Sequence, residues 1–268
     1  MAKVCAFANQ KGGVGKTTFS LQAVHYLLEI MKVEPSRILA IDFDGQGNFS
    51  SRLAGSCVDE YGDEVNDFKG GTASYELYTK DLDPISPIVC PSGIHLIHSE
   101  HNDTRLFNLG EAGSDDIVYI PRENLHKIID NYDYVIIDCP PSLGRNLTSA
   151  LVMSTHVAMP VRLAAFSVEG AIGLVETVIK IQSTKNPSLK NMGVIINGMD
   201  RSVSHRNSYN ILKDSLGDFM FKNMIRYRPP LDAATAEGVP IWSLTYGHVA
   251  SAEVKSVMDE LFDKVAKS

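Results

Sequence analysis

A glycine-rich segment near the N-terminus carries the side chains best suited to phosphate chemistry. Residues 9–18 read NQKGGVGKTT and lie between an apolar segment and a helical pattern. Glycines allow a tight turn that points several N–H groups at one anion, and the following helix adds its positive N-terminal end. Lys16 is expected to reach the β- and γ-phosphates of a nucleotide, and the Thr17 hydroxyl to bind Mg²⁺. The expected nucleotide-binding residues of this loop are Gly12, Gly13, Val14, Gly15, Lys16, Thr17 and Thr18.

Carboxylates stand at the ends of two other apolar segments. Residues 41–44 read IDFD and residues 134–138 read YVIID, so Asp42, Asp44 and Asp138 all follow apolar runs. In an open α/β sheet, ligands bind outside the carboxyl ends of the strands. A carboxylate at such a position can hold Mg²⁺, usually through a water molecule. We therefore expect these carboxylates at the mouth of the nucleotide site.

Apolar segments that are expected to form strands alternate with amphipathic patterns that are expected to form helices. The expected strands are residues 4–8, 37–43, 134–138, 155–160 and 193–197, and the expected helices are residues 17–31, 122–131, 146–154, 168–184 and 205–216. This alternation predicts an α/β fold of the P-loop NTPase type, with a mainly parallel, twisted sheet flanked by helices on both faces. We expect one domain over residues 1–268, with an acidic, weakly periodic insertion at about residues 56–120.

Composition and charge limit the classes of function. The 268-residue chain is 44% hydrophobic and has a formal net charge of −7, so its surface as a whole does not attract nucleic acid. Residues 180–228 are nevertheless basic, which can mark a local polyanion site. No apolar run approaches the roughly 20 residues of a membrane span, and we expect no signal peptide, since a strand-like segment follows Met1 almost directly. The four scattered cysteines fit a reduced, cytoplasmic protein with buried thiols.

Three segments resemble the motifs of the ParA/MinD family of deviant Walker A ATPases, and most of all its ParA (Soj-type) branch. They are KGGVGKTT at 11–18, DFDGQGN at 42–48 and IIDCPPS at 136–142. The resemblance implies an ATP-dependent homodimer in which Lys11 reaches the partner's nucleotide and acts in catalysis with Lys16. It assigns Asp44 to positioning the attacking water. It assigns Thr17, Asp42 and Asp138 to binding Mg²⁺.

The same resemblance extends to residues expected near the adenine base of ATP. Two residues of this sequence differ from the usual motifs. Asn197 corresponds to the asparagine that reads the adenine edge, and an amide offers the donor and the acceptor that this needs. Residues 225–230 correspond to the loop that closes over the base. Gln10 stands where a standard phosphate loop has glycine, and this departure accompanies the second lysine, Lys11. Gly45 replaces the family's usual proline, which is expected to loosen the loop that carries Asp44.

Within this family, the expected function is the partitioning of plasmid or chromosome DNA. In the ParA branch an ATP-bound dimer coats DNA without sequence preference, and a ParB-like centromere-binding protein stimulates hydrolysis, which makes the ATPase a nucleoid-associated protein of the cytoplasm. Basic side chains that neutralise phosphates give weak, salt-sensitive binding of this kind. The expected DNA contacts are Arg201, Arg206, Lys222, Arg226 and Arg228.

Other functions remain open at this point. A MinD-like, membrane-cycling ATPase would use a C-terminal amphipathic helix, but the apolar stripe at residues 254–265 lies among acidic residues, which suit anionic lipid poorly. We therefore expect this helix to pack on the core without membrane contact. A related ATPase would use the same switch to position a protein cargo. Redox or metal chemistry would need paired cysteines, or a histidine cluster such as His95, His98 and His101.

Overall fold

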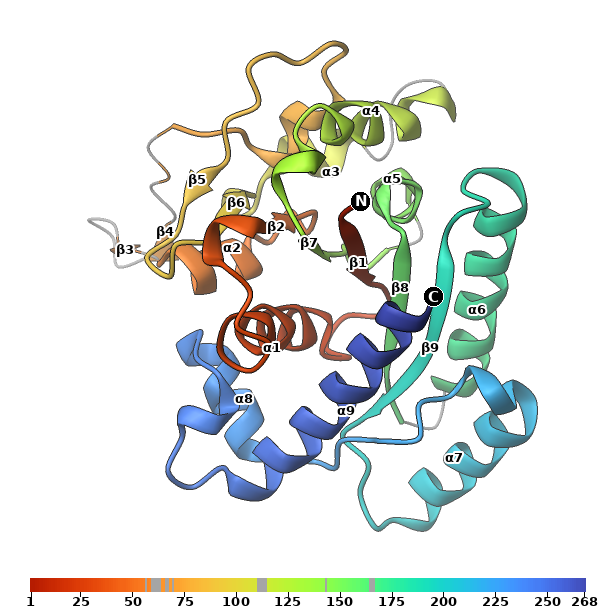
Figure 1. Cartoon of the computed structure of the whole chain (residues 1–268). Coiled ribbons are helices and arrows are strands. Elements are labelled where there is room, and N and C mark those ends of the chain that lie inside the picture. The colour runs from red at the N-terminus through yellow and green to blue at the C-terminus, as the bar shows by residue number, and fades with distance from the viewer. Residues whose placement is uncertain are drawn as a thin grey trace.

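A seven-stranded sheet runs through the centre of the molecule (Figure 1). The computed structural model describes residues 1–55, 57–58, 64–65, 68, 70–109, 115–142, 144–163 and 167–268. The strand order is β5-β6-β2-β7-β1-β8-β9, and all neighbours are parallel except the edge strand β5, which runs antiparallel to β6. The strands are β1 Lys3–Phe7, β2 Ile38–Asp42, β5 Ile88–Val89, β6 His95–Ile97, β7 Tyr134–Asp138, β8 His156–Arg162 and β9 Lys190–Asn197.

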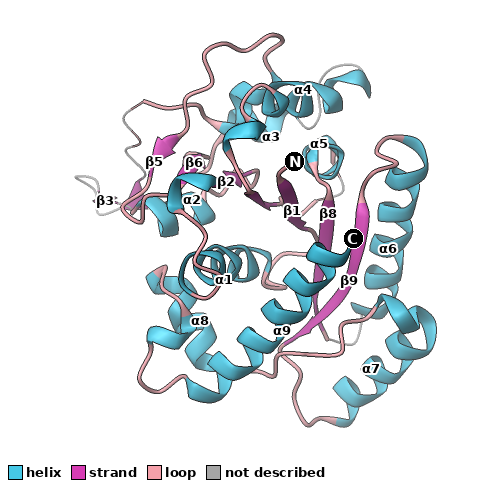
Figure 2. Ribbon diagram, in the orientation of Figure 1, coloured by secondary structure: helices cyan, strands magenta, loops and turns pink. Residues whose placement is uncertain are grey.

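Helices cover both faces of this sheet, which confirms the predicted α/β fold (Figure 2). They are α1 Lys16–Glu29, α2 Asn48–Ala54, α3 Thr104–Leu109, α4 Ile120–His126, α5 Arg145–Met153, α6 Ser167–Thr184, α7 Val203–Leu216, α8 Pro229–Glu237 and α9 His248–Lys267. Helices α1, α8 and α9 pack on one face, and α4, α5 and α6 pack on the other. The strands β1, β2 and β7 are almost continuously buried, because a parallel sheet is covered on both faces.

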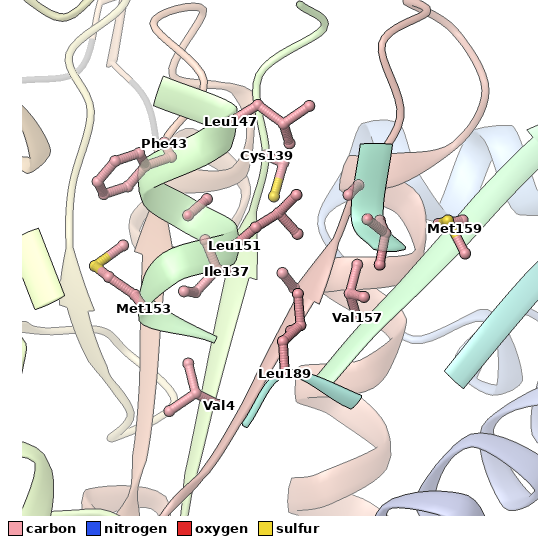
Figure 3. Packing of buried hydrophobic residues seen from close by; sticks show 14 of the residues in the cluster. Val4, Phe43, Ile137, Cys139, Leu147, Leu151, Met153, Val157, Met159 and Leu189 are labelled. Atoms are coloured by element: carbon pink, nitrogen blue, oxygen red, sulfur yellow. The ribbon is translucent and has the colours of Figure 1, made fainter. Parts of the chain in front are cut away.

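The core beneath α5 holds the central strands in place. Leu147 and Leu151 of α5 belong to one cluster with Val4 of β1, Ile137 of β7 and Val157 of β8, and each of these side chains is at most 1% exposed (Figure 3). Full burial of one such side chain contributes about 2 kcal/mol to folding. This packing therefore fixes the position of β7, whose last residue is the carboxylate predicted at the site.

The C-terminal helix α9 buries the apolar stripe that a membrane-binding helix would expose. Val254, Val257 and Leu261 are at most 1% exposed. The ring of Phe262 stacks on Tyr26 of α1 with the ring centroids 5.4 Å apart. The stripe packs on the core, as predicted. Among the described residues, no helix is both long enough and apolar enough to cross a membrane.

Part of the predicted 56–120 insertion belongs to the central sheet. Strand β6 pairs in parallel with β2, and β5 adds the antiparallel edge. The rest includes a two-stranded ribbon of β3 Cys57–Val58 and β4 Glu64–Val65, and 3₁₀ helices at Ser74–Tyr78 and Asp115–Tyr119. The sequence did not predict β5 or β6, because two or three residues are too few to show periodicity. The acidic positions Asp59, Glu60, Asp63, Asp67 and Glu111 lie outside the described residues.

Candidate nucleotide site

The glycine-rich loop connects β1 to the N-terminus of α1, as the sequence predicted. Gly13 and Gly15 adopt left-handed backbone angles, with φ of 70° and 102°. A side chain at Gly15 would also overlap the amide group of Asn197, which ends β9. Both the backbone angle and the close approach therefore require glycine here. The loop presents its backbone at the positive end of α1, where an anion is favoured.

An asparagine for which no role was expected from sequence anchors the start of the loop. The Asn9 side-chain amide donates a hydrogen bond to the Pro160 carbonyl of β8 at 2.6 Å. Its side-chain oxygen accepts a hydrogen bond from the Lys11 N–H at 2.9 Å. An asparagine that bonds the backbone two residues later is a turn signal that the sequence does contain. Asn9 is 4% exposed, so it ties the loop to the neighbouring strand inside the protein.

The two lysines of the loop lie in different environments. Lys16 is 6% exposed, and its ammonium group donates a hydrogen bond to the Lys11 carbonyl at 3.0 Å. The Lys11 side chain is exposed, and it lies beside Gly170 near the start of α6. The loop therefore presents one cation inward at its own phosphate position and another at the surface.

The predicted Mg²⁺ ligands meet at the ends of two paired strands. Asp42 and Asp138 are direct partners in the register of β2 and β7. The Thr17 hydroxyl donates a hydrogen bond to Asp138 Oδ2 at 2.6 Å, and the Ser20 hydroxyl donates to Asp138 Oδ1 at 3.1 Å. The Asp42 carboxylate accepts hydrogen bonds from the Ser50 N–H and hydroxyl, both at 2.8 Å. Strand pairing thus brings together side chains that are far apart in the sequence.

Asp44 lies next to this pair in the loop between β2 and α2. Its N–H donates to Asp42 Oδ1 at 3.1 Å, and its own carboxylate accepts a hydrogen bond from the Gln46 N–H at 3.1 Å. Asp44 is 8% exposed, and its side chain lines a cavity beside the phosphate loop. The carboxylate is therefore held at the surface of the site rather than in the core.

Electrostatics at the site favour a bound cation. Burial raises the pKa of Asp138 to about 7, and it raises the pKa of Asp44 as well. Burial and the nearby Asp138 and Asp44 carboxylates raise the pKa of Asp42. The buried Lys16 ammonium group lowers the pKa of Asp44 and of Asp138, but not enough to offset their burial. Hydroxyl and carboxylate oxygens are the ligands that Mg²⁺ prefers, so these residues fit a magnesium ion that would supply the missing positive charge.

A cavity of about 470 Å³ opens beside the phosphate loop and has the size of a nucleotide site. Its walls are Gly12, Gly13, Gly15, Lys16, Thr17, Thr18, Asp44, Gln46, Asn48, Pro141, Arg162, Asn197, Gly198, Arg226, Tyr227, Arg228, Leu231 and Asp232. Asn197 lies in this wall, and its amide N–H donates to the Val14 carbonyl at 2.9 Å. In this structure the amide donor of Asn197 therefore supports the phosphate loop.

Two of the five expected DNA contacts belong to the wall of this cavity. The Arg226 and Arg228 guanidinium groups both donate to Glu253 of α9, at 2.8 Å and 2.7 Å. Glu253 could not be recognised from sequence because it is 25 residues or more from both partners. Lys222 lines a separate groove with Glu260 and Lys264 of α9. Arg201 and Arg206 are exposed at the start of α7. The five expected contacts thus lie on three parts of the structure: the start of α7, the wall of the nucleotide cavity and the groove along α9.

The histidines and cysteines have separate structural partners. His95 bonds the Tyr132 hydroxyl at 2.8 Å, His98 packs on Phe68, and His101 bonds the Gln46 carbonyl at 3.1 Å. The described part of the chain contains no group of three His, Cys, Asp or Glu side chains arranged to hold a metal without a nucleotide. Cys5, Cys90 and Cys139 are buried free thiols, and burial raises their pKa values. The burial of Cys5, Cys90 and Cys139 agrees with the buried thiols expected from sequence.

The fold and these side chains define a P-loop NTPase. A family model described as an AAA domain matches residues 2–191. The chain is 32% identical over 250 residues to the sporulation initiation inhibitor protein Soj of Bacillus subtilis, with 90% of each protein covered. It is 31% identical over 244 residues to the chromosome-partitioning ATPase Soj of Treponema pallidum, with 91% of this chain and 90% of that protein covered.

Solved structures share the fold. A putative plasmid partition protein of Borrelia burgdorferi, bound to AMPPNP, superposes with a TM-score of 0.76 at 23% identity, and the match covers 98% of this chain and all of that one. The chain belongs to the ParA/MinD family of deviant Walker A ATPases. It is a nucleotide-hydrolysing P-loop ATPase of the ParA type, which confirms the predicted family.

Proposed function

We propose that this protein is a partitioning ATPase whose ATP-bound homodimer binds DNA without sequence preference and releases it after hydrolysis. The observation that carries the proposal is the pair of lysines on one phosphate loop, with Lys16 buried and Lys11 exposed. The buried Lys16 suits the phosphates of its own site, and the exposure of Lys11 supports a role for this second cation in the site of a partner subunit. The similarity to two Soj proteins supports partitioning as the purpose of this switch.

Each site uses its own residues for the nucleotide and the metal ion. The backbone of residues 12–18 and the Lys16 ammonium bind the phosphates. Thr17, Asp42 and Asp138 bind Mg²⁺ directly or through water, and hydrolysis depends on this ion. The Mg²⁺ ion, when bound, neutralises charge on the phosphates and on the three buried carboxylates. Asn197 supports the loop and contacts the adenine base.

Lys11 completes the site of the partner subunit. A cation aimed at the transferred phosphoryl group stabilises the charge that develops there, as an arginine finger does. Because Lys11 contacts a nucleotide held by the other subunit, ATP binds the dimer more tightly than the monomer. This difference in affinity is what allows ATP to act as a switch.

Asp44 orients the attacking water. Its carboxylate is held by the Gln46 N–H at the edge of the cavity, so its position depends on the loop after β2. Hydrolysis in the absence of a partner is slow, because the water is poorly aligned. A ParB-like centromere-binding protein corrects this alignment and triggers release from DNA on the nucleoid.

The DNA surface of the dimer centres on the start of α7. Arg201 and Arg206 are exposed there, and Lys222 adds a third cation elsewhere on the surface. Arg226 and Arg228 contribute less to DNA binding, since Glu253 already neutralises part of their charge. Cations that displace counterions from DNA give affinity that falls steeply as salt rises.

The decisive experiment measures binding to a random-sequence DNA duplex with ATP, ADP or no nucleotide, across a series of salt concentrations. Binding that requires ATP and weakens steeply with salt supports the proposal. The double variant Arg201→Ala and Arg206→Ala should lose most of this binding, whereas Lys80→Ala, which removes an exposed cation just after the 3₁₀ helix Ser74–Tyr78, serves as the matched control. ATP-driven dimerisation without DNA binding would refute the DNA surface and favour a protein cargo.

A further inference from the structure

The loop that carries Asp44 is held from outside by residues 99–107, which follow strand β6. The Ser99 N–H donates to the Ser50 hydroxyl at 2.9 Å, and that hydroxyl donates to Asp42. His101 Nδ1 lies 3.1 Å from the Gln46 carbonyl oxygen. The Asp103 N–H donates to the Gly45 carbonyl at 2.7 Å. The 99–107 segment therefore contacts the loop at residues 45 and 46 and the start of α2 at residue 50.

The segment is itself fixed to the helix that follows the Asp138 strand. The Asn146 amide of α5 donates to the Leu106 carbonyl at 2.7 Å, and its oxygen accepts a hydrogen bond from the Tyr78 hydroxyl at 2.8 Å. Leu106 and Asn146 are 0% and 6% exposed. The segment thus connects the Asp44 loop to the part of the protein that carries Asp138.

The next residue after Leu106 is the partly exposed Phe107, which lies against the glycine that stands in place of the family's usual proline. A Cβ atom on Gly45 would lie 2.9 Å from two ring carbons of Phe107 and 3.1 Å from the Asp103 carbonyl oxygen. Real Cβ atoms essentially never approach a carbon atom that closely. Gly45 does not adopt a left-handed backbone angle, so its own conformation does not require glycine. The Phe107 ring occupies the space that a side chain at position 45 would fill.

We propose that Phe107, seated on Gly45, is a positioning residue that holds Asp44 and Gln46 in the geometry for ATP hydrolysis. The Gln46 N–H bonds the Asp44 carboxylate, so movement of residue 45 is passed directly to the carboxylate. The Phe107 ring and Gly45 act as one unit. Packing of the 99–107 segment against residue 45 restrains the loop, as the ring of a proline would. The inference rests on the proposed role of Asp44 in orienting water.

A double-mutant cycle tests this unit. Gly45→Ala pushes the ring away and should lower kcat roughly tenfold, because small displacements of catalytic groups have effects of this size. Phe107→Ala should lower kcat about threefold, since the backbone bonds to the loop remain. In the double variant the methyl group introduced at position 45 fills the vacated space, so kcat should recover to about the Phe107→Ala value. The affinity for a non-hydrolysable ATP analogue should stay within about twofold of wild type in all three variants.

Two further measurements separate positioning from a general structural role. Hydrogen exchange at the Gln46 amide should accelerate in Gly45→Ala and return towards wild type in the double variant, because this amide bonds Asp44. Gly173→Ala is the matched control, since a Cβ there meets no heavy atom of the described residues within 4 Å, and its kcat and Gln46 exchange should match wild type.

The outcomes distinguish the two proposals. If Asp44→Ala hydrolyses ATP normally, the role of Asp44 is refuted. If Asp44→Ala is inactive and the effects of Gly45→Ala and Phe107→Ala multiply in the double variant, the unit formed by the ring and the glycine is refuted. Equal losses of kcat and nucleotide affinity in Gly45→Ala would also overturn it.

Discussion

Helix α9 should control nucleotide affinity through the carboxylate of Glu253. Glu253 accepts hydrogen bonds from the Arg226 N–H at 3.0 Å and from its guanidinium at 2.8 Å. It also accepts two from the Arg228 guanidinium, at 3.2 Å and 2.7 Å. Burial alone would raise the pKa of Glu253, but these hydrogen bonds lower it overall. Both arginines line the nucleotide cavity, so Glu253→Ala should weaken ATP binding.

The size of the effect follows from the exposure of the partners. The Glu253 side chain is 12% exposed, whereas those of Arg226 and Arg228 are 59% and 29% exposed. Partly exposed ion pairs contribute about 1 kcal/mol or less each, and hydrogen bonds to charged groups add to this. We therefore expect a loss of about 2 kcal/mol in unfolding free energy and a melting temperature lower by roughly 5 °C. The affinity for ATP should fall roughly tenfold as the 226–228 loop loosens.

Glu260 provides a matched control further along the same helix. It is 11% exposed and accepts hydrogen bonds from the Lys222 and Asn223 N–H groups and the Asn223 amide, each at 2.9 Å. The described walls of the nucleotide cavity include neither of these partners. Glu260→Ala should therefore lose comparable stability and keep wild-type affinity for ATP. Calorimetric titration with an ATP analogue and thermal unfolding measure both quantities, and equal ATP affinity in the two variants would refute the reasoning.

Three further predictions concern single residues. Lys11→Ala should bind ATP but lose hydrolysis and the stable ATP dimer, as measured by phosphate release and light scattering, and normal turnover would contradict its action on the partner's site. Asp44→Ala should bind ATP and accumulate as a dimer on DNA, so rapid hydrolysis by this variant would remove Asp44 from the mechanism. Burial, with help from Lys3 and Lys190, lowers the pKa of His156 from 6.5 to about 4. Between these values the unfolded chain binds a proton that the folded protein does not, so stability should fall as pH drops from 6.5 to 4. His156→Gln should show a smaller fall in denaturant titrations over this window, and an identical fall would show that His156 is not responsible.

The phosphate loop and the central strands could be predicted from sequence because their signals are local. Apolar runs ending in Asp42 and Asp138 mark strands whose carboxyl ends meet in a parallel sheet, and the structure pairs these two residues directly. The apolar stripe of α9 likewise indicated a buried face, and its core packing is confirmed. In each case the pattern lies within one element, and the general geometry of a parallel sheet or of an amphipathic helix supplies the structural consequence.

The contacts that complete the site could not be predicted, since they join distant residues. The basic charge of residues 180–228 made Arg226 and Arg228 candidates for DNA contacts. The carboxylate that pairs with both of them is that of Glu253, which lies on helix α9. The loss of proline at Gly45 suggested a loose loop, whereas Phe107 packs against this glycine. The role of Ser50 in bonding Asp42 depends on α2, a helix of seven residues that shows too little periodicity to be recognised.

The assembly of the site from distant strands also sets when ATP turnover can begin. Thr17 and its partner Asp138 are separated by 121 residues, and β7 must insert between β1 and β2 before they can meet. At synthesis rates of about 5–20 residues per second, Asp138 is synthesised on the order of 10 seconds after the phosphate loop. Arg228 and Glu253 emerge later still. A growing chain therefore has no working catalytic centre, and nucleotide consumption is tied to completion of the fold.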